Sequence, residues 1–408
     1  MSKTEMPSIR FRGFGDAWEQ RKLDEFVSFF SGLTYSPADI RPAGTLVLRS
    51  SNVKDGEVVD ADNVYVDPAV VNSENVQDGD IIVVVRNGSR ALIGKHAEIK
   101  GFRPNTVIGA FMTGIRSEHP SFLNALLNTP HFDKEVEMNM GATINQITGY
   151  MFSKMEFMVP SPDEQDAIGE YFKKLDNLIT LHQRKFEKLT NVKKSMLEKM
   201  FPRNGSCYPE IRFKGFTAPW EQRKLEDYLS VSNEKNTSDV YGRADVLSVS
   251  GDFGIVNQIE FQGRSFAGAS VSNYGVVQTG DVVYTKSPLN SNPYGIIKTN
   301  KGKAGIVSTL YAVYHPRETV FPDFVQVYFE QHARMNNYMH PLVNKGAKND
   351  MKVSAENALK GPVCFPSYAE QRTISAFFSA LGNLITFHQT ELEKLQSIKK
   401  ALLEKMFV

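Results

Sequence analysis

Basic, amide and hydroxyl side chains gather directly after several short apolar runs of this 408-residue sequence. Arginine can form two hydrogen bonds with guanine, and asparagine or glutamine can form two with adenine, so side chains of these types could read the bases of DNA. For any single residue, a place in a solvated turn is an equally good explanation. The candidate DNA-binding residues are Arg49, Ser50, Asn52, Arg86, Asn87, Ser89, Arg90, Lys95, Thr143, Asn145 and Gln146 in the first half of the chain, and Lys286, Ser287, Asn290, Asn292, Lys298, Lys345, Lys348 and Asn349 in the second.

Catalytic and cofactor motifs are missing from the sequence. It holds neither a glycine-rich strand-to-helix signature for S-adenosylmethionine nor a GxxxxGK[ST] phosphate loop. The segment Asn292-Pro293-Tyr294-Gly295 is similar to the asparagine-proline-proline-aromatic motif of adenine methyltransferases but lacks its second proline, and an ordinary turn before a strand explains it as well. We expect no catalytic residue and no cofactor bound by this chain. A self-sufficient adenine DNA methyltransferase built on Asn292 to Gly295 is the alternative hypothesis.

Composition sets further limits. The net charge of +1 gives no argument for nucleic acid, so any basic surface must arise from segregation of charge within the fold. Two cysteines, Cys207 and Cys364, cannot build a multi-cysteine zinc site. The apolar run at residues 81–85 is far too short to span a bilayer, and the first residues do not resemble a signal segment. We expect a cytoplasmic protein that does not associate with a membrane.

Duplicated blocks organise the chain. Residues 7–23 read PSIRFRGFGDAWEQRKL, and residues 209–225 read PEIRFKGFTAPWEQRKL. A second pair begins at residue 160 with PSPDEQDAIGEYFKKLDNLITLHQ and at residue 366 with PSYAEQRTISAFFSALGNLITFHQ, and both copies close on LEKMF. The segments between these blocks barely resemble one another. The repeat therefore predicts a variable domain at 1–159, a spacer helix at 160–203, a second variable domain at 204–365 and a second spacer helix at 366–408.

Both spacer segments carry apolar residues at alternating spacings of three and four, which predicts a coiled coil. We expect capping boxes at Ser161 with Glu164 and at Ser367 with Glu370 to start the two helices. Two histidines occupy equivalent positions in the pattern; because no cysteine or carboxylate joins them at ligand spacing, we assign them to packing and expect no metal. The predicted seam consists of Phe172, Leu175, Ile179, His182, Phe186 and Leu189 in the first helix, and Phe378, Leu381, Ile385, His388, Leu392 and Leu395 in the second.

The variable segments combine short valine- and isoleucine-rich runs with helical stretches, which is typical of compact α+β domains. Two copies of one ancestral unit usually pack with pseudo-twofold symmetry, although two tandem domains without spatial symmetry would give the same sequence pattern. The predicted fold is therefore α+β: two domains related by pseudo-twofold symmetry and separated by two long helices that form an antiparallel coiled coil.

The order of these motifs resembles the specificity (S) subunits of type I restriction-modification enzymes, the HsdS family, over nearly the whole chain. The motifs are the RFxGF…WEQRKL openings, a GD pair at Gly79-Asp80 and Gly280-Asp281, a GA pair at Gly141-Ala142 and Gly346-Ala347, and the helices that begin with EQ. The resemblance implies that each variable segment is a target-recognition domain that reads one half of a bipartite sequence in double-stranded DNA. A pure coiled-coil scaffold is the third hypothesis, which two divergent domains disfavour.

The same resemblance implies partners and site residues. Two methyltransferase (M) subunits would dock on the paired helices, and two restriction (R) subunits would complete the complex; S-adenosylmethionine, ATP and Mg would bind to those partners. Arg86 with Asn87 and Ser89, and Lys286 with Ser287, match the family's readout loop after the GD strand. The second copy has lysine where arginine is commoner. The base sequence that is read does not follow from the resemblance.

Overall fold

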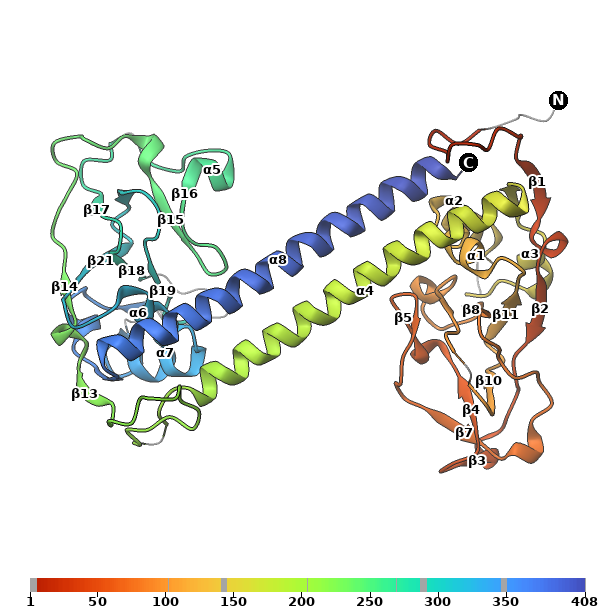
Figure 1. Cartoon of the computed structure of the whole chain (residues 1–408), viewed down its shortest axis with the longest axis horizontal. Coiled ribbons are helices and arrows are strands. Elements are labelled where there is room, and N and C mark those ends of the chain that lie inside the picture. The colour runs from red at the N-terminus through yellow and green to blue at the C-terminus, as the bar shows by residue number, and fades with distance from the viewer. Residues whose placement is uncertain are drawn as a thin grey trace. The chain divides into compact units, whose positions relative to one another are not determined.

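The computed structural model describes residues 6–101, 103–140, 145–203, 205–268, 270–286, 292–345 and 351–407. The chain forms two compact units, which are labelled by element in Figure 1. Unit 1 consists of Met1–Gln183 and Gln389–Val408, and unit 2 consists of Arg184–His388. Among the described residues, no helix has the length and apolar character needed to cross a membrane.

The central sheet of unit 1 is antiparallel, with the strand order β2-β11-β8-β9. The apolar run that follows Gly79-Asp80 forms β8, and all four of its residues are buried, as expected for a short apolar run bounded by turns. The strands are β2 (Ser28–Ser31), β11 (Met112–Arg116), β8 (Ile81–Val84) and β9 (His96–Glu98).

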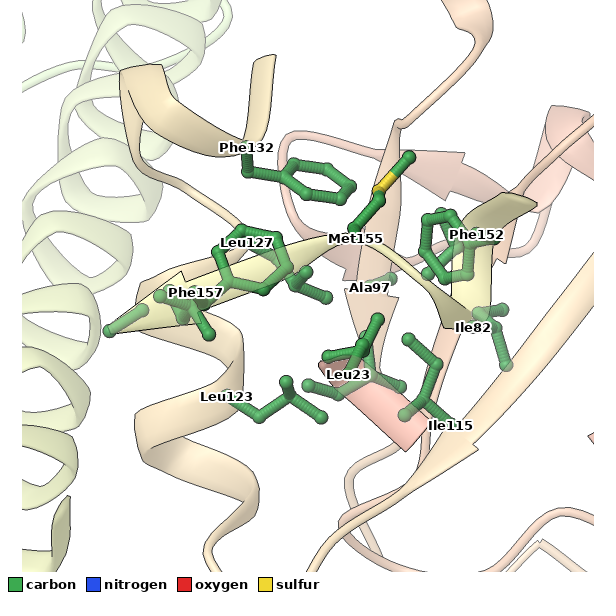
Figure 2. Packing of buried hydrophobic residues seen from close by; sticks show 14 of the residues in the cluster. Leu23, Ile82, Ala97, Ile115, Leu123, Leu127, Phe132, Phe152, Met155 and Phe157 are labelled. Atoms are coloured by element: carbon green, nitrogen blue, oxygen red, sulfur yellow. The ribbon is translucent and has the colours of Figure 1, made fainter. Parts of the chain in front are cut away.

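A second sheet of unit 1 has the order β10-β4-β7-β3 and contains one parallel pair, β10 with β4. Its strands are β10 (Thr106–Ile108), β4 (Thr45–Leu48), β7 (Val64–Val66) and β3 (Ile40–Arg41). Smaller elements are the pair β5 (Val53–Lys54) and β6 (Glu57–Val58), the pair β1 (Glu19–Lys22) and β12 (Glu156–Val159), and the helices α1 (Pro120–Leu126), α2 (Pro130–Asn139) and α3 (Gly149–Ser153). The core between the helices and the central sheet includes Leu23, Ile115, Phe132 and Phe157 (Figure 2).

Unit 2 repeats the central sheet with different residues. Its order, β14-β21-β18-β19, matches β2-β11-β8-β9 strand for strand. These strands are β14 (Leu229–Val231), β21 (Tyr311–Pro316), β18 (Val282–Thr285) and β19 (Ile297–Thr299). The other elements are β13 (Glu221–Lys224) with β24 (Pro362–Phe365), β15 (Leu247–Ser250) with β16 (Gly254–Asn257), β17 (Gly275–Val277) with β20 (Gly305–Val307), β22 (Asn344–Lys345) with β23 (Met351–Lys352), and the helices α5 (Gln258–Gln262), α6 (Pro322–Phe329) and α7 (His332–Met339).

Each GD pair forms the turn before a strand, Gly79-Asp80 before β8 and Gly280-Asp281 before β18. Gly79 and Gly280 have φ angles of 85° and 93°, in the left-handed region that favours glycine. The next residue closes the turn, because Asp80 accepts a 2.7 Å hydrogen bond from the Gln77 amide, as Asp281 does from the Gln278 amide. Both aspartates are buried. The GD motif is thus a structural turn, as its position before a strand predicts.

Two long helices follow the duplicated PS turns, α4 (Pro162–Lys199) and α8 (Tyr368–Met406). All predicted seam residues of both helices are buried or half-buried. Within unit 1 the helices are antiparallel, because Asp176 near the start of α4 pairs with Lys399 near the end of α8 at 2.6 Å. No group of three or more His, Cys, Asp or Glu side chains in the described ranges could hold a metal ion, and His182 and His388 belong to none.

The four-part division of the chain stays a prediction, and the two compact units of the structure cut across it. Unit 1 contains the first part of α4 and the last part of α8, and unit 2 contains the remaining parts. The apolar ends of the helices complete the domain cores: Phe407 packs on Phe172 in unit 1, and Phe201 packs on Phe378 in unit 2. Each domain therefore depends on residues from both helices for its hydrophobic core.

Candidate nucleic-acid interface

Three of the predicted loops meet at one edge of unit 1. The Asn87 side chain, after β8, donates a 2.9 Å hydrogen bond to Ser50, in the loop after β4. Asn145 donates its side-chain amide to the Gly88 carbonyl at 3.0 Å, and Arg86 forms a backbone bridge with Gln146. The structure thus brings residues from positions 50, 87 and 145 into contact. Thr143 lies outside the described residues.

The side chain of Arg86 lies on an aromatic ring. Its guanidinium carbon is 4.9 Å from the centroid of Phe111, in the turn between β10 and β11. Among the described residues, no hydrogen bond or ion pair holds this guanidinium. A hollow of about 600 Å³ adjoins the ring and is lined by apolar and polar side chains, among them Tyr35, Arg49 and Ser50. The edge therefore offers a cation, an aromatic face and hydroxyl groups to a ligand.

Two residues of the first predicted loop have other roles. Arg49 is one-third exposed and forms a 3.0 Å ion pair with Asp62. Asn52 is fully buried: its amide donates to Ala61 and Asn63, and its carbonyl oxygen accepts from the Arg49 backbone. The structure therefore does not place Asn52 on the exposed edge, because its hydrogen-bonding groups hold the loop together.

The remaining candidates of unit 1 are exposed. The Ser89 amide donates to the Asn87 side chain at 2.9 Å, which shapes the turn after β8. Arg90 begins the short helix η5 (Arg90–Leu92), and Lys95 lies just before β9. All three residues present their side chains to solvent, next to the edge where the loops meet.

Unit 2 has the same backbone arrangement at its corresponding edge. The amide of Lys286, after β18, donates to the Leu310 carbonyl at 3.1 Å, as the Arg86 amide donates to the Phe111 carbonyl at 3.2 Å. Lys286 is half-buried; burial lowers its pKa, nearby Lys235 lowers it further, and Glu356 opposes the shift. Lys345 lies in β22. Ser287, Asn290, Lys348 and Asn349 lie outside the described residues.

Lys298 does not belong to this edge. It lies in β19 opposite Val283 and is only 7% exposed, and burial lowers its pKa. The corresponding position of unit 1, opposite Val83, holds His96, which is also buried. The structure therefore does not bring Lys298 to the edge where the other candidates lie, because composition alone does not distinguish a lysine in a sheet from a loop lysine.

The segment from Asn292 to Gly295 forms a tight turn before β19. The Gly295 amide donates to the Asn292 carbonyl at 2.9 Å, and Tyr284 donates its hydroxyl to the Tyr294 carbonyl at 2.8 Å. Gly295 has a φ of 79°, and a Cβ atom there would lie 1.9 Å from the Thr285 carbonyl oxygen. The geometry is the ordinary turn before a strand, and it requires glycine at its last position.

Sequence reasoning did not identify Phe111 or Leu310. Both are large apolar residues that are more than half exposed, at 54% and 62%. The turns that carry them correspond, because the next amide donates back in both, from Met112 to Gly109 and from Tyr311 to Ser308. A large apolar residue in a turn between two predicted strands is the only sequence signal that could have indicated them.

Comparisons with known proteins agree with the resemblance. Residues 15–191 match the family described as the type I restriction modification DNA specificity domain. The chain is 24% identical over 173 residues to the type I restriction enzyme StySPI specificity subunit of Salmonella potsdam, an alignment that covers 40% of this chain and 36% of that protein. It is 22% identical over 424 residues to the type I restriction enzyme EcoKI specificity subunit of Escherichia coli K12, covering 96% of this chain and 89% of that protein.

A solved structure shares the fold. The crystal structure of the type I restriction-modification system S subunit from M. genitalium superposes with a TM-score of 0.62 and covers 99% of both chains, at 14% identity. The match extends over both units and both long helices, so the arrangement of elements described above is that of a known fold.

Proposed function

We propose, from the premise that this chain belongs to the family of type I restriction-modification specificity subunits, that its two units each read one half of a bipartite DNA target. The observation that carries the proposal is the meeting of three loops around Arg86, Asn87 and Ser50. Phosphate contacts position a protein on DNA, whereas side chains that reach the base edges specify sequence. An exposed arginine flanked by amide and hydroxyl groups has the chemistry of base readout.

The two units would read different half-sites. Each unit has a central sheet of the same strand order, and in each the residue after the GD strand donates its amide to a carbonyl in a neighbouring turn. The side chains on this common framework differ. Arg86 and Phe111 of unit 1 correspond to Lys286 and Leu310 of unit 2. In unit 1, β4 pairs in parallel with β10 and is followed by a loop. In unit 2, a parallel bridge joins Val246 to Ile306 and is followed by the β15-β16 hairpin, so the two segments differ. A shared framework with different side chains suits two readers of unlike sequence.

Exposed apolar residues on the long helices support partner docking. Leu178 of α4 and Leu384 of α8 are 46% and 49% exposed, and Val192 and Ile398 are each 37% exposed. These pairs occupy corresponding positions of the duplicated helices. Because apolar side chains are presented at corresponding positions twice, they suit two copies of one partner. We assign these faces to two methyltransferase subunits, with two restriction subunits joining the full complex.

Catalysis would then belong to the partners. S-adenosylmethionine, ATP and Mg would bind to the methyltransferase and restriction subunits, and this chain would recognise DNA without catalysing a reaction. We place the complex in the cytoplasm, where it meets cellular DNA. The alternative, a methyltransferase built on Asn292 to Gly295, has less support because Gly295 is required there by the backbone turn alone.

One experiment tests the proposal. The chain is produced alone and together with its methyltransferase subunits, and methylated adenines are mapped by sequencing plasmid DNA from both cultures. We expect adenine methylation at a split sequence only when the subunits are together, and we expect the purified chain alone to bind no S-adenosylmethionine in equilibrium dialysis. Methyl transfer by the chain alone would establish the alternative. Methylation at an undivided sequence would contradict two separate readers.

The docking assignment has its own test. The double variant Leu178→Asp, Leu384→Asp should lose co-purification with the methyltransferase subunits while both units keep their melting temperatures, because both side chains are about half exposed. The matched control is Lys174→Asp, an exposed position on the same helix. Unchanged co-purification of the double variant would assign the docking surface elsewhere.

A further inference from the structure

We infer that Phe111 is a positioning residue that orients Arg86 toward a guanine in the half-site read by unit 1. The inference rests on the proposed function and names one base of the target. Phe111 lies in the turn between β10 and β11, and Arg86 lies after β8. The two residues are therefore brought together by the sheet and not by the local sequence.

Phe111 holds both the backbone and the side chain of Arg86. Its carbonyl oxygen accepts hydrogen bonds from the amides of Val85 and Arg86, at 3.1 and 3.2 Å, which fixes the point where the arginine leaves the sheet. Its ring then supports the guanidinium, with 4.9 Å between the guanidinium carbon and the ring centroid. The ring remains 54% exposed, so burial in the hydrophobic core does not explain its position beside the guanidinium.

A guanidinium held over an aromatic ring is suited to guanine. The ring attracts the cation without using its hydrogen-bond donors, so the N–H groups stay available for two parallel hydrogen bonds. Guanine presents two acceptors, O6 and N7, on its major-groove edge, and arginine binds both. Carboxylates engage two other arginines of unit 1: Asp80 pairs with Arg116 at 2.8 Å, and Glu164 pairs with Arg10 at 2.6 Å. Among the described residues no carboxylate holds Arg86, so the Phe111 ring takes the place of such a partner.

Unit 2 provides a natural comparison. Leu310 occupies the position of Phe111 and is 62% exposed, and its carbonyl accepts the Lys286 amide at 3.1 Å. Leucine has no π face to attract a cation, and the ammonium of lysine is a point charge that lacks a planar edge. At this position, the coupling of a ring to the cation after the GD strand is therefore expected in unit 1 and not in unit 2, and substitution of Leu310 serves as the matched control.

The test uses the chain assembled with its methyltransferase subunits. Methylation rates are measured on a set of DNA targets in which each base pair of both half-sites is changed in turn, for wild type, R86A, F111A, F111Y, L310A and the double variant R86A/F111A. Wild type must first methylate a bipartite site; if it does not, the proposed function fails, and the inference about Phe111 fails with it. Melting temperatures confirm that the variants fold.

We expect R86A to reduce discrimination at a single G·C pair by about fivefold or more, as for loss of a two-bond contact. F111A should reduce discrimination about two- to fivefold at that same pair, the scale of an exposed cation–π contact, and F111Y should retain it. F111A should add nothing when Arg86 is already absent. L310A should leave this half-site unchanged.

The inference would be overturned by relaxation of a different base pair by F111A, by effects of F111A and R86A that multiply in the double variant, or by a preferred base other than guanine at the pair that R86A relaxes. A drop in methylation by F111A that is uniform over all targets would also overturn it, because that result would make Phe111 a purely structural residue or a contact to the DNA backbone.

Discussion

Arg10 holds the buried carboxylate of Glu164 through two hydrogen bonds, 2.6 Å from its Nε and 2.7 Å from its Nη2. Arg212 holds Glu370 in the same way in unit 2, with both bonds at 2.7 Å. These ion pairs fasten the RFxGF segments to the starts of α4 and α8. The predicted capping boxes are therefore replaced: the helices begin near the expected residues, but both carboxylate oxygens of each glutamate bind an arginine.

Loss of Arg10 should destabilise unit 1 strongly. In Arg10→Ala the carboxylate of Glu164, which is 0% exposed, would lose its partner, and an unpaired buried charge typically costs about 3–5 kcal/mol. The matched control is Arg12→Ala, an exposed position two residues away that should change stability by less than about 0.5 kcal/mol. Thermal unfolding followed by circular dichroism compares the variants. Equal melting temperatures for Arg10→Ala and wild type would contradict this role of the ion pair.

Substitution of the two readout cations should affect opposite half-sites. Arg86→Ala should weaken recognition of one half-site by about 1–3 kcal/mol, because a base contact is lost, while the other half is still read. Lys286→Ala should relax the other half. Competition binding of the assembled complex to DNA with changes in one half at a time measures both effects. If both variants relaxed the same bases, the assignment of one unit to each half-site would be wrong.

Stability of unit 1 should fall in mild acid because of His96. Its Nδ1 donates to the Gly94 carbonyl at 3.1 Å, its Nε2 has no partner among the described residues, and burial lowers its pKa to about 4. An unfolded histidine titrates near 6.5, so between pH 6.5 and pH 4 the unfolded state binds more protons and stability rises with pH. The contribution is fully present above about pH 6.5, and about 2 kcal/mol of it is lost at pH 5.

His96→Asn removes the titrating group and keeps a donor for Gly94. Melting temperatures at pH 7.5 and pH 5 should therefore differ less in this variant than in wild type. The control is His131→Asn, a half-exposed histidine of the same unit. An identical acid-induced decrease in wild type and His96→Asn would show that the acid sensitivity arises elsewhere.

The length of the long helices should set the spacing of the half-sites. Both α4 and α8 run from one unit into the other, and at about 1.5 Å per residue each spans roughly 57 Å. Insertion of four residues into both helices, between Thr180 and Phe186 and between Thr386 and Leu392, adds about 6 Å, close to two base-pair steps of about 3.4 Å.

Methylation mapping of the insertion variant should show unchanged half-sites with a spacer longer by one or two base pairs. The control carries the insertion in α4 alone; the seam within each unit pairs α4 with α8, so an unmatched insertion should reduce assembly. An unchanged spacer in an active complex with both insertions would mean that helix length does not determine the spacing.

Local patterns predicted much of the fold. The duplicated blocks indicated two related units, and the central sheets β2-β11-β8-β9 and β14-β21-β18-β19 have the same strand order. The spacing of three and four predicted the seam on α4 and α8, because residues at that spacing share one face of a helix. A glycine just before a strand likewise indicates a backbone that side chains disfavour, and Gly79 and Gly280 adopt such a backbone.

The site depended on contacts between distant residues. Asn52 and Asn87 are both amides in predicted loops, but one is buried and fully bonded and the other borders the exposed edge. The sequence around Lys298 predicted a loop, whereas strand pairing places this lysine in β19 opposite Val283. Phe111 had no chemical signature of its own.

The duplication, the helical seam and the residue types available for readout could be read from the sequence, because repeats and helical faces depend on local spacing along the chain. Which of those residues meet depended on the fold. Strand pairing, which joins Arg86 to Gln146 and places Phe111 beneath its guanidinium, depends on the packing of the whole domain. The same packing brings the apolar end of α8 into the core of unit 1 and the apolar end of α4 into the core of unit 2.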